Sequence, residues 1–312
     1  MIKGSKPTFR SIVYDWFMST VAHLINRTQR QLLSGVVEER NKISSALTAT
    51  ATSVVFSYET RSIQPGAIVE VDSELMYVWE VVSGTKTATV ERGFNGTTAA
   101  AHTAGSMCIV DPRFPRNQIL EAFNDDLSDL SAPMNGLYRV KSLDLNYNGS
   151  DTFINLPSVG DVIELLDVRL RYLSTDYPMI RKVAIVRNLP TSDFGSGTAL
   201  KFSEPTRSGS LRITYKAPFN RIMKETDDIQ TNVGFPISAE DILILGAQIR
   251  LMAPREIKRN FTESQGDTRR ADEVPAGAVS NSINQLQRLR RDRISAEATK
   301  LDSQYPIYMI RD

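Results

Sequence analysis

The sequence predicts a mixed α+β fold: a bundle of about four helices with two inserted antiparallel β-modules and an extended C-terminal tail. Three observations predict it. Four segments repeat apolar residues at the three- and four-residue spacing of an amphipathic helix. Two stretches between them hold short β-branched runs broken by turn residues. The last residues are apolar and aromatic, and they continue neither pattern.

The composition is that of an ordinary globular chain, with 41% hydrophobic and 23% charged residues among 312. The formal net charge of +1 provides no global basic field to attract nucleic acid or acidic lipid. No apolar run reaches the roughly 18 residues that a membrane span needs, and the first residues do not lead into a signal-peptide core. We therefore expect a soluble intracellular product with no membrane contact.

The first expected helix covers about residues 9–33, and Gly35 suits its end. Its apolar stripe is so wide that other helices must cover it. The members of the stripe are Ile12, Val13, Trp16, Phe17, Thr20, Val21, Leu24, Ile25 and Leu32.

The first β-module is expected over residues 43–112. Turn dipeptides such as Pro65-Gly66 and Asn95-Gly96 separate its β-branched runs, which predicts a small antiparallel, barrel-like fold. The runs cover residues 53–58, 67–71, 75–82 and 87–91.

Helical spacing resumes over about residues 115–131, where Pro115 suits a first helical position. Strand patterns return over residues 137–219, and short strands at this spacing predict a β-sandwich. The expected strands cover residues 137–145, 152–156, 162–172, 179–187, 199–203 and 210–216.

Two more helices complete the pattern, separated by a polar loop over about residues 262–275. One covers about residues 238–252, with Ser238 as its N-cap and a halt near Pro254, and the other covers about 278–302. A string of independent domains is the alternative, but one bundle with insertions is favoured because loop closure costs rise slowly with length. The bundle then comprises residues 1–42, 113–136 and 220–303, and the tail comprises 304–312.

No set of residues predicts catalysis, a metal site or a cofactor. We interpret His102 as a loop histidine bonded to backbone, His23 as a helix-flank residue and Cys108 as a buried strand residue. Asp125, Asp126 and Asp129 cluster on one helix, where a solvated helix face is favoured over a metal or glycosidase site, and Asp227 with Asp228 lies in a polar connection. We therefore expect a protein that is not an enzyme.

The last helix carries a basic strip on the side opposite its apolar stripe. The strip could face DNA or an acidic protein, or it could be an ordinary solvated helix face. Its members are Arg288, Arg290, Arg291, Arg293 and Lys300.

The tail presents large apolar side chains that water does not favour. Either it folds back on the chain's own bundle, or it enters a groove of a partner. Its members are Tyr305, Pro306, Ile307, Tyr308, Met309, Ile310 and Arg311.

One segment resembles a β-module common in tailed-bacteriophage virion proteins. There a strand that ends in V-x-R-G is followed by G-T-T/A-A-A-A-H-x-x-G; here Val90 to Gly93 and Gly96 to Gly105 match it. The resemblance extends over Val69 to Val110 and does not specify one station in the virion.

A helical bundle with β-insertions and a C-terminal extension resembles the head-to-tail adaptor (connector) proteins of the phage neck. The resemblance implies a structural virion protein that is made in the host cytoplasm and forms a ring of about twelve copies. Its partners would be the portal protein, on which the tail docks, a tail or nozzle protein, and packaged DNA contacted non-specifically. The ring would line or close the DNA channel.

A different class of function is a receptor- or glycan-binding tail component that uses residues 137–217. Tyrosines of this region could stack on a saccharide, or they could be strand and rim residues. They are Tyr138, Tyr147, Tyr172, Tyr177 and Tyr215.

Overall fold

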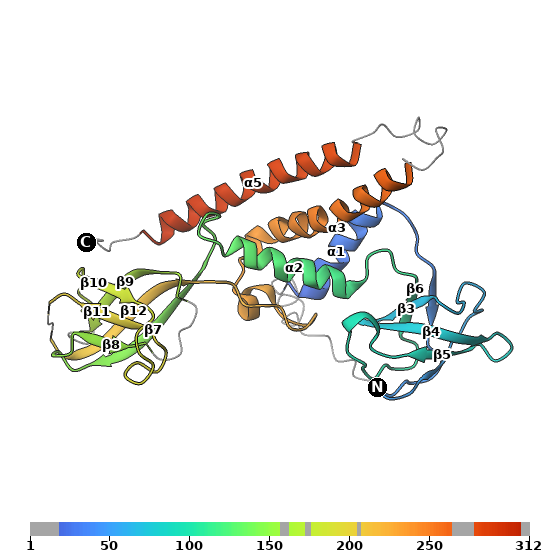
Figure 1. Ribbon diagram of the computed structural model, residues 1–312, viewed down its shortest axis with the longest axis horizontal. Coiled ribbons are helices and arrows are strands. Elements are labelled where there is room, and N and C mark those ends of the chain that lie inside the picture. Colours follow the sequence, from blue (N-terminus) through green and yellow to red (C-terminus); the bar gives the residue numbers. More distant parts are fainter. Residues whose placement is uncertain (1–18, 157–161, 172–175, 205–206, 264–277, 307–312) are drawn as a thin grey trace, which may run out of the picture. The chain divides into compact units, whose positions relative to one another are not determined.

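The computed structural model describes residues 19–156, 162–171, 176–204, 207–263 and 278–306 (Figure 1). Within these residues the chain is mixed α+β, as predicted. It divides into two compact units. The first unit comprises Met1–Asn124, Ile222–Asp227 and Leu243–Asn284, and the second comprises Asp125–Arg221, Asp228–Ile242 and Gln285–Asp312.

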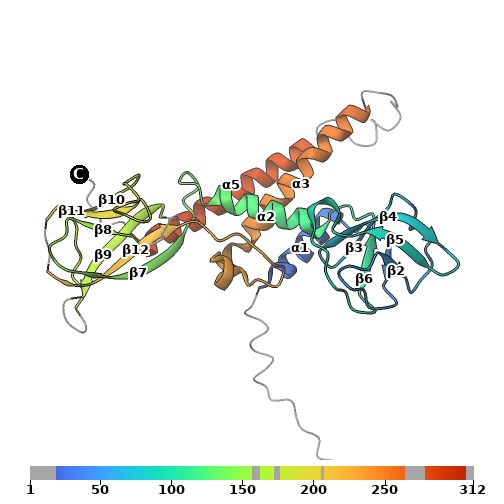
Figure 2. The same ribbon diagram turned by 60° about the horizontal axis from the view of Figure 1, so that its bottom comes forward.

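The first unit contains a six-stranded antiparallel sheet with the strand order β1-β6-β3-β4-β5-β2 (Figures 1 and 2). A bridge between Ile43 and Phe56, which follow the two edge strands, brings the edges together. The sheet therefore curls into a half-barrel, which agrees with the barrel-like prediction. Its strands are β1 (Arg40–Lys42), β2 (Ser53–Val55), β3 (Ile68–Val71), β4 (Glu74–Val82), β5 (Thr87–Glu91) and β6 (Met107–Val110).

Alternating side chains fill the half-barrel with one hydrophobic core. Ala88 and Val90 of β5 are buried, whereas Thr89 and Glu91 are exposed, as a period of two requires. Cys108 of β6 belongs to the same core, so its prediction as a buried strand residue is confirmed.

Helix α1 begins at Val21 and ends at Leu33. Thr20 is extended and caps it, because its side chain accepts a hydrogen bond from the backbone N–H of His23. The prediction that Thr20 lies inside a longer helix is therefore wrong. The predicted stripe residues before Ser19 lie outside the described residues.

The other long helices are α2 (Arg116–Leu130), α3 (Glu240–Glu263) and α5 (Ala278–Gln304). The predicted halt near Pro254 is wrong, because α3 continues through it. A proline removes one helical hydrogen bond, but the helix formers that follow it can keep the helix going. Ser238 does not cap α3 directly; it lies in a 3-10 turn, Ile237–Ala239, before the helix.

The second unit contains two three-stranded antiparallel sheets, with the orders β7-β12-β9 and β10-β11-β8. All six strands expected in this region are present. Buried residues of both sheets form one hydrophobic cluster, in which Tyr147 of β7 stacks on Phe202 of β11 at a centroid distance of 5.0 Å. The strands are β7 (Arg139–Tyr147), β8 (Phe153–Asn155), β9 (Glu164–Arg171), β10 (Val183–Val186), β11 (Ala199–Phe202) and β12 (Gly209–Ala217).

Candidate functional site

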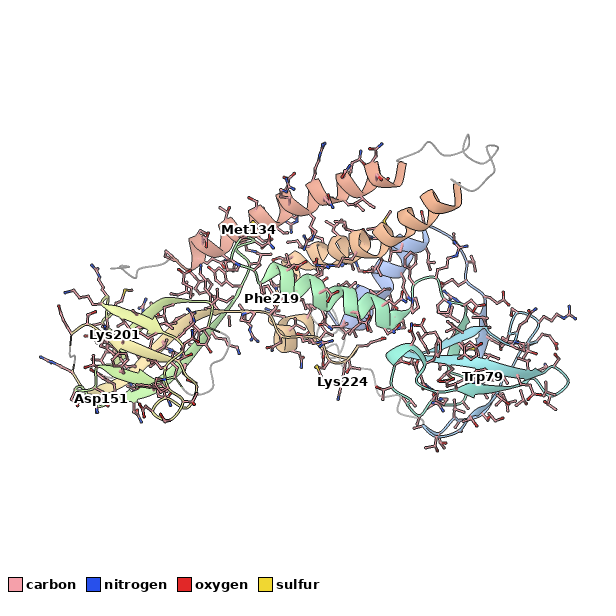
Figure 3. All side chains as sticks on the ribbon, viewed as in Figure 1. Trp79, Met134, Asp151, Lys201, Phe219 and Lys224 are labelled. Carbon is pink, nitrogen blue, oxygen red and sulfur yellow. The ribbon has the colours of Figure 1, made fainter. Side chains whose placement is uncertain are left out.

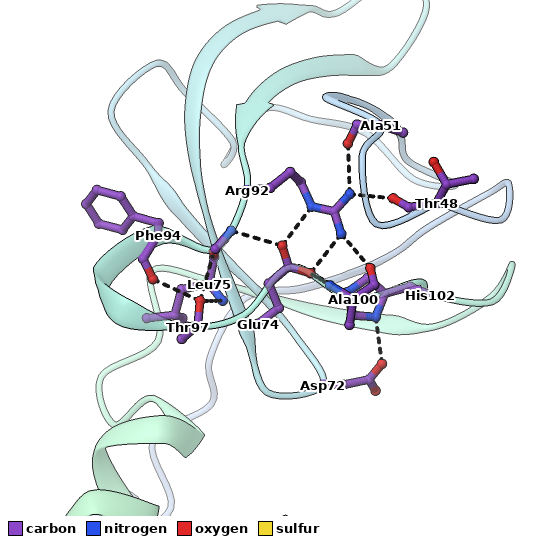
Figure 4. Close-up of polar contacts among 11 residues, drawn as sticks. Thr48, Ala51, Asp72, Glu74, Leu75, Arg92, Phe94, Thr97, Ala100 and His102 are labelled. Carbon is purple, nitrogen blue, oxygen red and sulfur yellow. Dashed lines mark hydrogen bonds and ion pairs between the residues drawn. The ribbon is translucent and has the colours of Figure 1, made fainter.

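Residues of the 90–105 motif meet around one buried carboxylate, that of Glu74 at the start of β4 (Figure 4). Arg92 donates two hydrogen bonds to it, from Nε at 2.7 Å and from Nη2 at 2.8 Å. The backbone N–H groups of Gly93 and Ala100 donate to it at 3.1 Å and 2.9 Å. His102 Nε2 lies 2.8 Å from it. The carboxylate is thus surrounded by donors on both oxygens.

The guanidinium of Arg92 also ties three loop positions together. It donates to the backbone carbonyls of Thr48 at 2.7 Å, Ala51 at 2.8 Å and Ala100 at 2.6 Å. Only 6% of the Arg92 side chain is exposed, so these bonds replace water almost completely. The buried ion pair between Arg92 and Glu74 therefore stabilises the half-barrel by joining these loop positions to β4.

The electrostatics of Glu74 follow from this enclosure. Burial by itself raises the pKa of a carboxyl, but hydrogen bonds from Arg92, Ala100, His102 and Gly93 outweigh it and hold the pKa of Glu74 at about 2. Glu74 is consequently ionised throughout the physiological range.

Gly93 is required at its position in the motif. Its φ is +62°, and an added Cβ would lie 2.9 Å from the carbonyl oxygen of Thr97. A side chain there would strain the turn and displace the N–H that binds Glu74.

His102 lies between two carboxylates and is 4% exposed. Its Nδ1 is 2.8 Å from Asp72 and its Nε2 is 2.8 Å from Glu74. The prediction that this ring bonds to backbone is wrong, although the backbone of His102 does pair with that of Leu47. Both nitrogens are engaged inside the protein, so the ring does not present a base to a substrate.

A second buried carboxylate, Glu70 of β3, lies at the start of α2. Its Oε1 accepts a hydrogen bond from the backbone N–H of Arg116 at 2.6 Å, and the guanidinium of Arg116 binds Glu225. Burial raises the pKa of Glu70 to about 7, although the N–H and the charge of Arg116 oppose that rise. Glu70 therefore serves as a side-chain cap of α2 and titrates near neutrality.

The remaining single-residue candidates are structural. His23 is exposed on α1, as a helix-flank residue should be. Burial raises the pKa of the Cys108 thiol to about 12, so it is not a reactive thiolate. Asp227 accepts hydrogen bonds from the backbone of Met223 and Lys224, so it closes a turn.

Asp228 likewise closes a turn, where its carboxylate accepts hydrogen bonds from the N–H groups of Gln230 and Thr231. Asp126 departs from the expected solvated face. It is 1% exposed and pairs with Arg290 of α5 at 2.7 Å, whereas Asp125 and Asp129 are exposed.

Ion pairs within the second unit engage three residues of the basic strip of α5: Arg290, Arg293 and Lys300. Besides Arg290, Arg293 pairs with Asp241 at 2.6 Å and Lys300 pairs with Glu297 at 3.3 Å. Arg288 and Arg291 are exposed. Of the predicted strip, these last two are the members whose charge is most open to a partner.

The beginning of the predicted docking tail follows α5. Tyr305 is 40% exposed, and its N–H donates to the carbonyl of Leu301 at 2.9 Å. Tyr305 and Pro306 line a hollow with residues of β9 and β12. The tail residues Ile307, Tyr308, Met309, Ile310 and Arg311 lie outside the described residues.

The tyrosine face expected on residues 137–217 does not form as predicted. Tyr138, Tyr147 and Tyr215 are each no more than 6% exposed, so they belong to the interior and cannot stack on a saccharide. Tyr177 is half-buried, and Tyr172 lies outside the described residues.

Comparisons with known proteins add no relative. No protein-family model matches the chain, and no curated protein sequence matches it. In the described part of the chain, no helix is both long and apolar enough to span a bilayer. The same residues contain no group of three or more His, Cys, Asp or Glu side chains arranged to hold a metal ion.

Proposed function

We propose that this chain is a non-enzymatic structural protein of a tailed-phage virion, located at the neck, where it joins the portal to the tail or nozzle. The observation that carries the proposal is the convergence of Arg92, Gly93 and His102 on Glu74. Every residue of the motif named here has a structural task in the half-barrel. A shared fold would require these residue types at these positions, whereas a coincidental similarity of sequence would not.

In this proposal the long helices form a bundle, with the half-barrel and a β-sandwich as its insertions. Copies associate side by side through the helices in a closed ring of about twelve, in which each contact joins two different surfaces. The ring lines or closes the DNA channel of the virion. Its partners are the portal, the tail or nozzle protein, further copies of itself and packaged DNA.

Removal of residues 304–312 is expected to abolish binding to the cognate portal ring, because the tail supplies the apolar docking residues. The measurement is co-sedimentation of the portal ring with the full chain and with a chain that ends at Ser303. Thermal unfolding of the shortened chain should match that of the full chain. Unchanged affinity of the shortened chain would exclude the docking role, and no co-sedimentation of either chain would favour a more distal position in the tail.

The double substitution Arg288→Gln/Arg291→Gln is expected to weaken non-specific binding of duplex DNA. Loss of two phosphate contacts should lower the slope of log K against log salt by about 2. Fluorescence anisotropy across a salt series measures this slope. Arg181→Gln/Lys201→Gln removes the same charge from exposed positions in the 137–219 region. An equal effect of both pairs would show that α5 does not face DNA.

The alternative class, a receptor- or glycan-binding tail component, requires a surface other than the buried tyrosines. A polar hollow in the same unit, lined by residues of β7, β8 and the connection between β10 and β11, offers one.

A further inference from the structure

An open polar hollow of about 470 Å³ lies in the second unit, where β7 turns into β8. The end of β7, the turn after it and β8 form one side. Asp193 and Phe194, from the connection between β10 and β11, form the other. Figure 3 shows Asp151, which belongs to the turn, on the outside of these sheets.

The hollow has an aromatic part. Phe153 of β8 and Phe194 are half-buried, and their ring centroids lie 5.9 Å apart at an interplanar angle of 56°. Hydrogen bonds hold the loop that carries Phe194: its N–H donates to the carbonyl of Pro190 at 3.0 Å, and the N–H of Gly197 donates to its carbonyl at 2.7 Å. The two rings thus offer a partly exposed apolar surface on a hydrogen-bonded support.

Hydrogen bonds also fix the turn that follows β7, which lines the same hollow. The hydroxyl of buried Tyr147 donates to the backbone carbonyl of Asp151 at 3.0 Å. Asn148 Oδ1 accepts hydrogen bonds from the N–H groups of Ser150 at 3.0 Å and Asp151 at 3.1 Å. Its oxygen is therefore occupied, and its amide nitrogen remains as a donor.

The lining of the hollow contains both acceptors and donors. The carboxylate of Asp151 is exposed. Asp193 is exposed as well and supplies a second carboxylate. The exposed amides of Asn146 and Asn155 add donors to the same lining. This combination suits a ligand whose groups both donate and accept.

We propose that this hollow binds a neutral saccharide. A sugar hydroxyl donates to a carboxylate while it accepts from an amide, and the C–H face of a sugar ring covers an aromatic ring. The residues that line the hollow include two carboxylates and no Lys, Arg or His, and one cation lies beside them, Lys201, whose Nζ is 6.0 Å from the ring centroid of Phe153. With two carboxylates against this one ammonium, the site disfavours phosphates, nucleic acids and acidic sugars. Small cations gain little here, because solvent screens two exposed carboxylates. The proposal does not depend on the neck assignment.

The test uses the full chain and a printed array of neutral oligosaccharides built from glucose, galactose and mannose, followed by titration of any ligand found. At least one should bind. Asp151→Ala and Phe194→Ala should each weaken that binding roughly ten-fold or more, since each removes a direct contact. Asp176→Ala, an equal change at another exposed position of the second unit, should leave it unchanged.

Three results would overturn the proposal. They are a lack of binding to every oligosaccharide on the array, an affinity of the Asp151→Ala variant equal to that of the unaltered chain, and displacement of the sugar by spermidine at ordinary ionic strength. Thermal unfolding of each variant separates loss of the site from loss of the fold, and Asp151→Ala leaves the backbone carbonyl that anchors Tyr147 in place.

Discussion

Replacement of Arg92 by methionine is expected to lower the free energy of unfolding by about 3–5 kcal/mol, because it leaves the carboxylate of Glu74 buried without its cation. The side chain of Glu74 is 1% exposed, so water cannot take the place of the guanidinium. The carbonyls of Thr48, Ala51 and Ala100 lose their donor in the same step. Chemical denaturation followed by circular dichroism measures the change, and hydrogen exchange of β4 and β5 locates it.

The matched control is Lys86→Met, which removes the cation of the exposed pair between Lys86 and Glu59 at 3.5 Å. Such a pair contributes at most about 1 kcal/mol. The double variant Arg92→Met/Glu74→Met should regain part of the lost stability, since it no longer buries an unpaired charge. If Arg92→Met and Lys86→Met unfold at the same denaturant concentration, Arg92 does not stabilise the half-barrel through its buried ion pair.

The strands were the most predictable part of the fold, because most of them carry enough apolar or β-branched residues to show their period. Strand β1 was missed for the opposite reason. Arg40-Asn41-Lys42 is short and polar, and it is a strand only because β6 offers it a partner. The continuation of α3 past Pro254 shows a similar limit, since a local stop signal does not record the helix formers after it.

The polar interior was much less predictable. Glu70 and Glu74 stand in β-branched or apolar strand segments, but so does the exposed Glu80 of β4, so the sequence pattern does not distinguish a buried carboxylate from an exposed one. The partners of buried carboxylates are also distant in sequence: Arg116 lies 46 residues from Glu70, and Arg290 lies 164 residues from the buried Asp126. Only the folded chain shows that the arginine and histidine of one motif bind the same carboxylate.

Helix α5 shows how a charge pattern misleads when it is read alone. The sequence places five basic residues on one side of the helix, and a uniform strip is the simplest interpretation. Ion pairs with Asp126, Asp241 and Glu297 instead assign Arg290, Arg293 and Lys300 to contacts within the second unit. A surface for DNA or an acidic partner is therefore smaller than the sequence suggests.

Glu70→Gln is expected to stabilise the chain near neutral pH and to have little effect in mild acid. Folding raises the pKa of Glu70 from 4.5 to about 7, so between these values the folded state holds a proton that the unfolded state has released. The contribution of Glu70 to stability is complete below 4.5 and is lost as the pH rises through 7. Glutamine cannot ionise, so the advantage of the variant should grow by about 3 kcal/mol from mild acid to about pH 8.

Unfolding by urea at several pH values measures that advantage directly. The hydrogen bond from the Arg116 N–H survives in the variant, because the amide oxygen of glutamine accepts it as Oε1 of Glu70 does. Glu80→Gln, the same change at an exposed position of β4, shows the effect of the substitution without burial. A difference between Glu70→Gln and the unaltered chain that does not vary with pH would mean that folding leaves the pKa of Glu70 unchanged, with Arg116 offsetting the effect of burial in full.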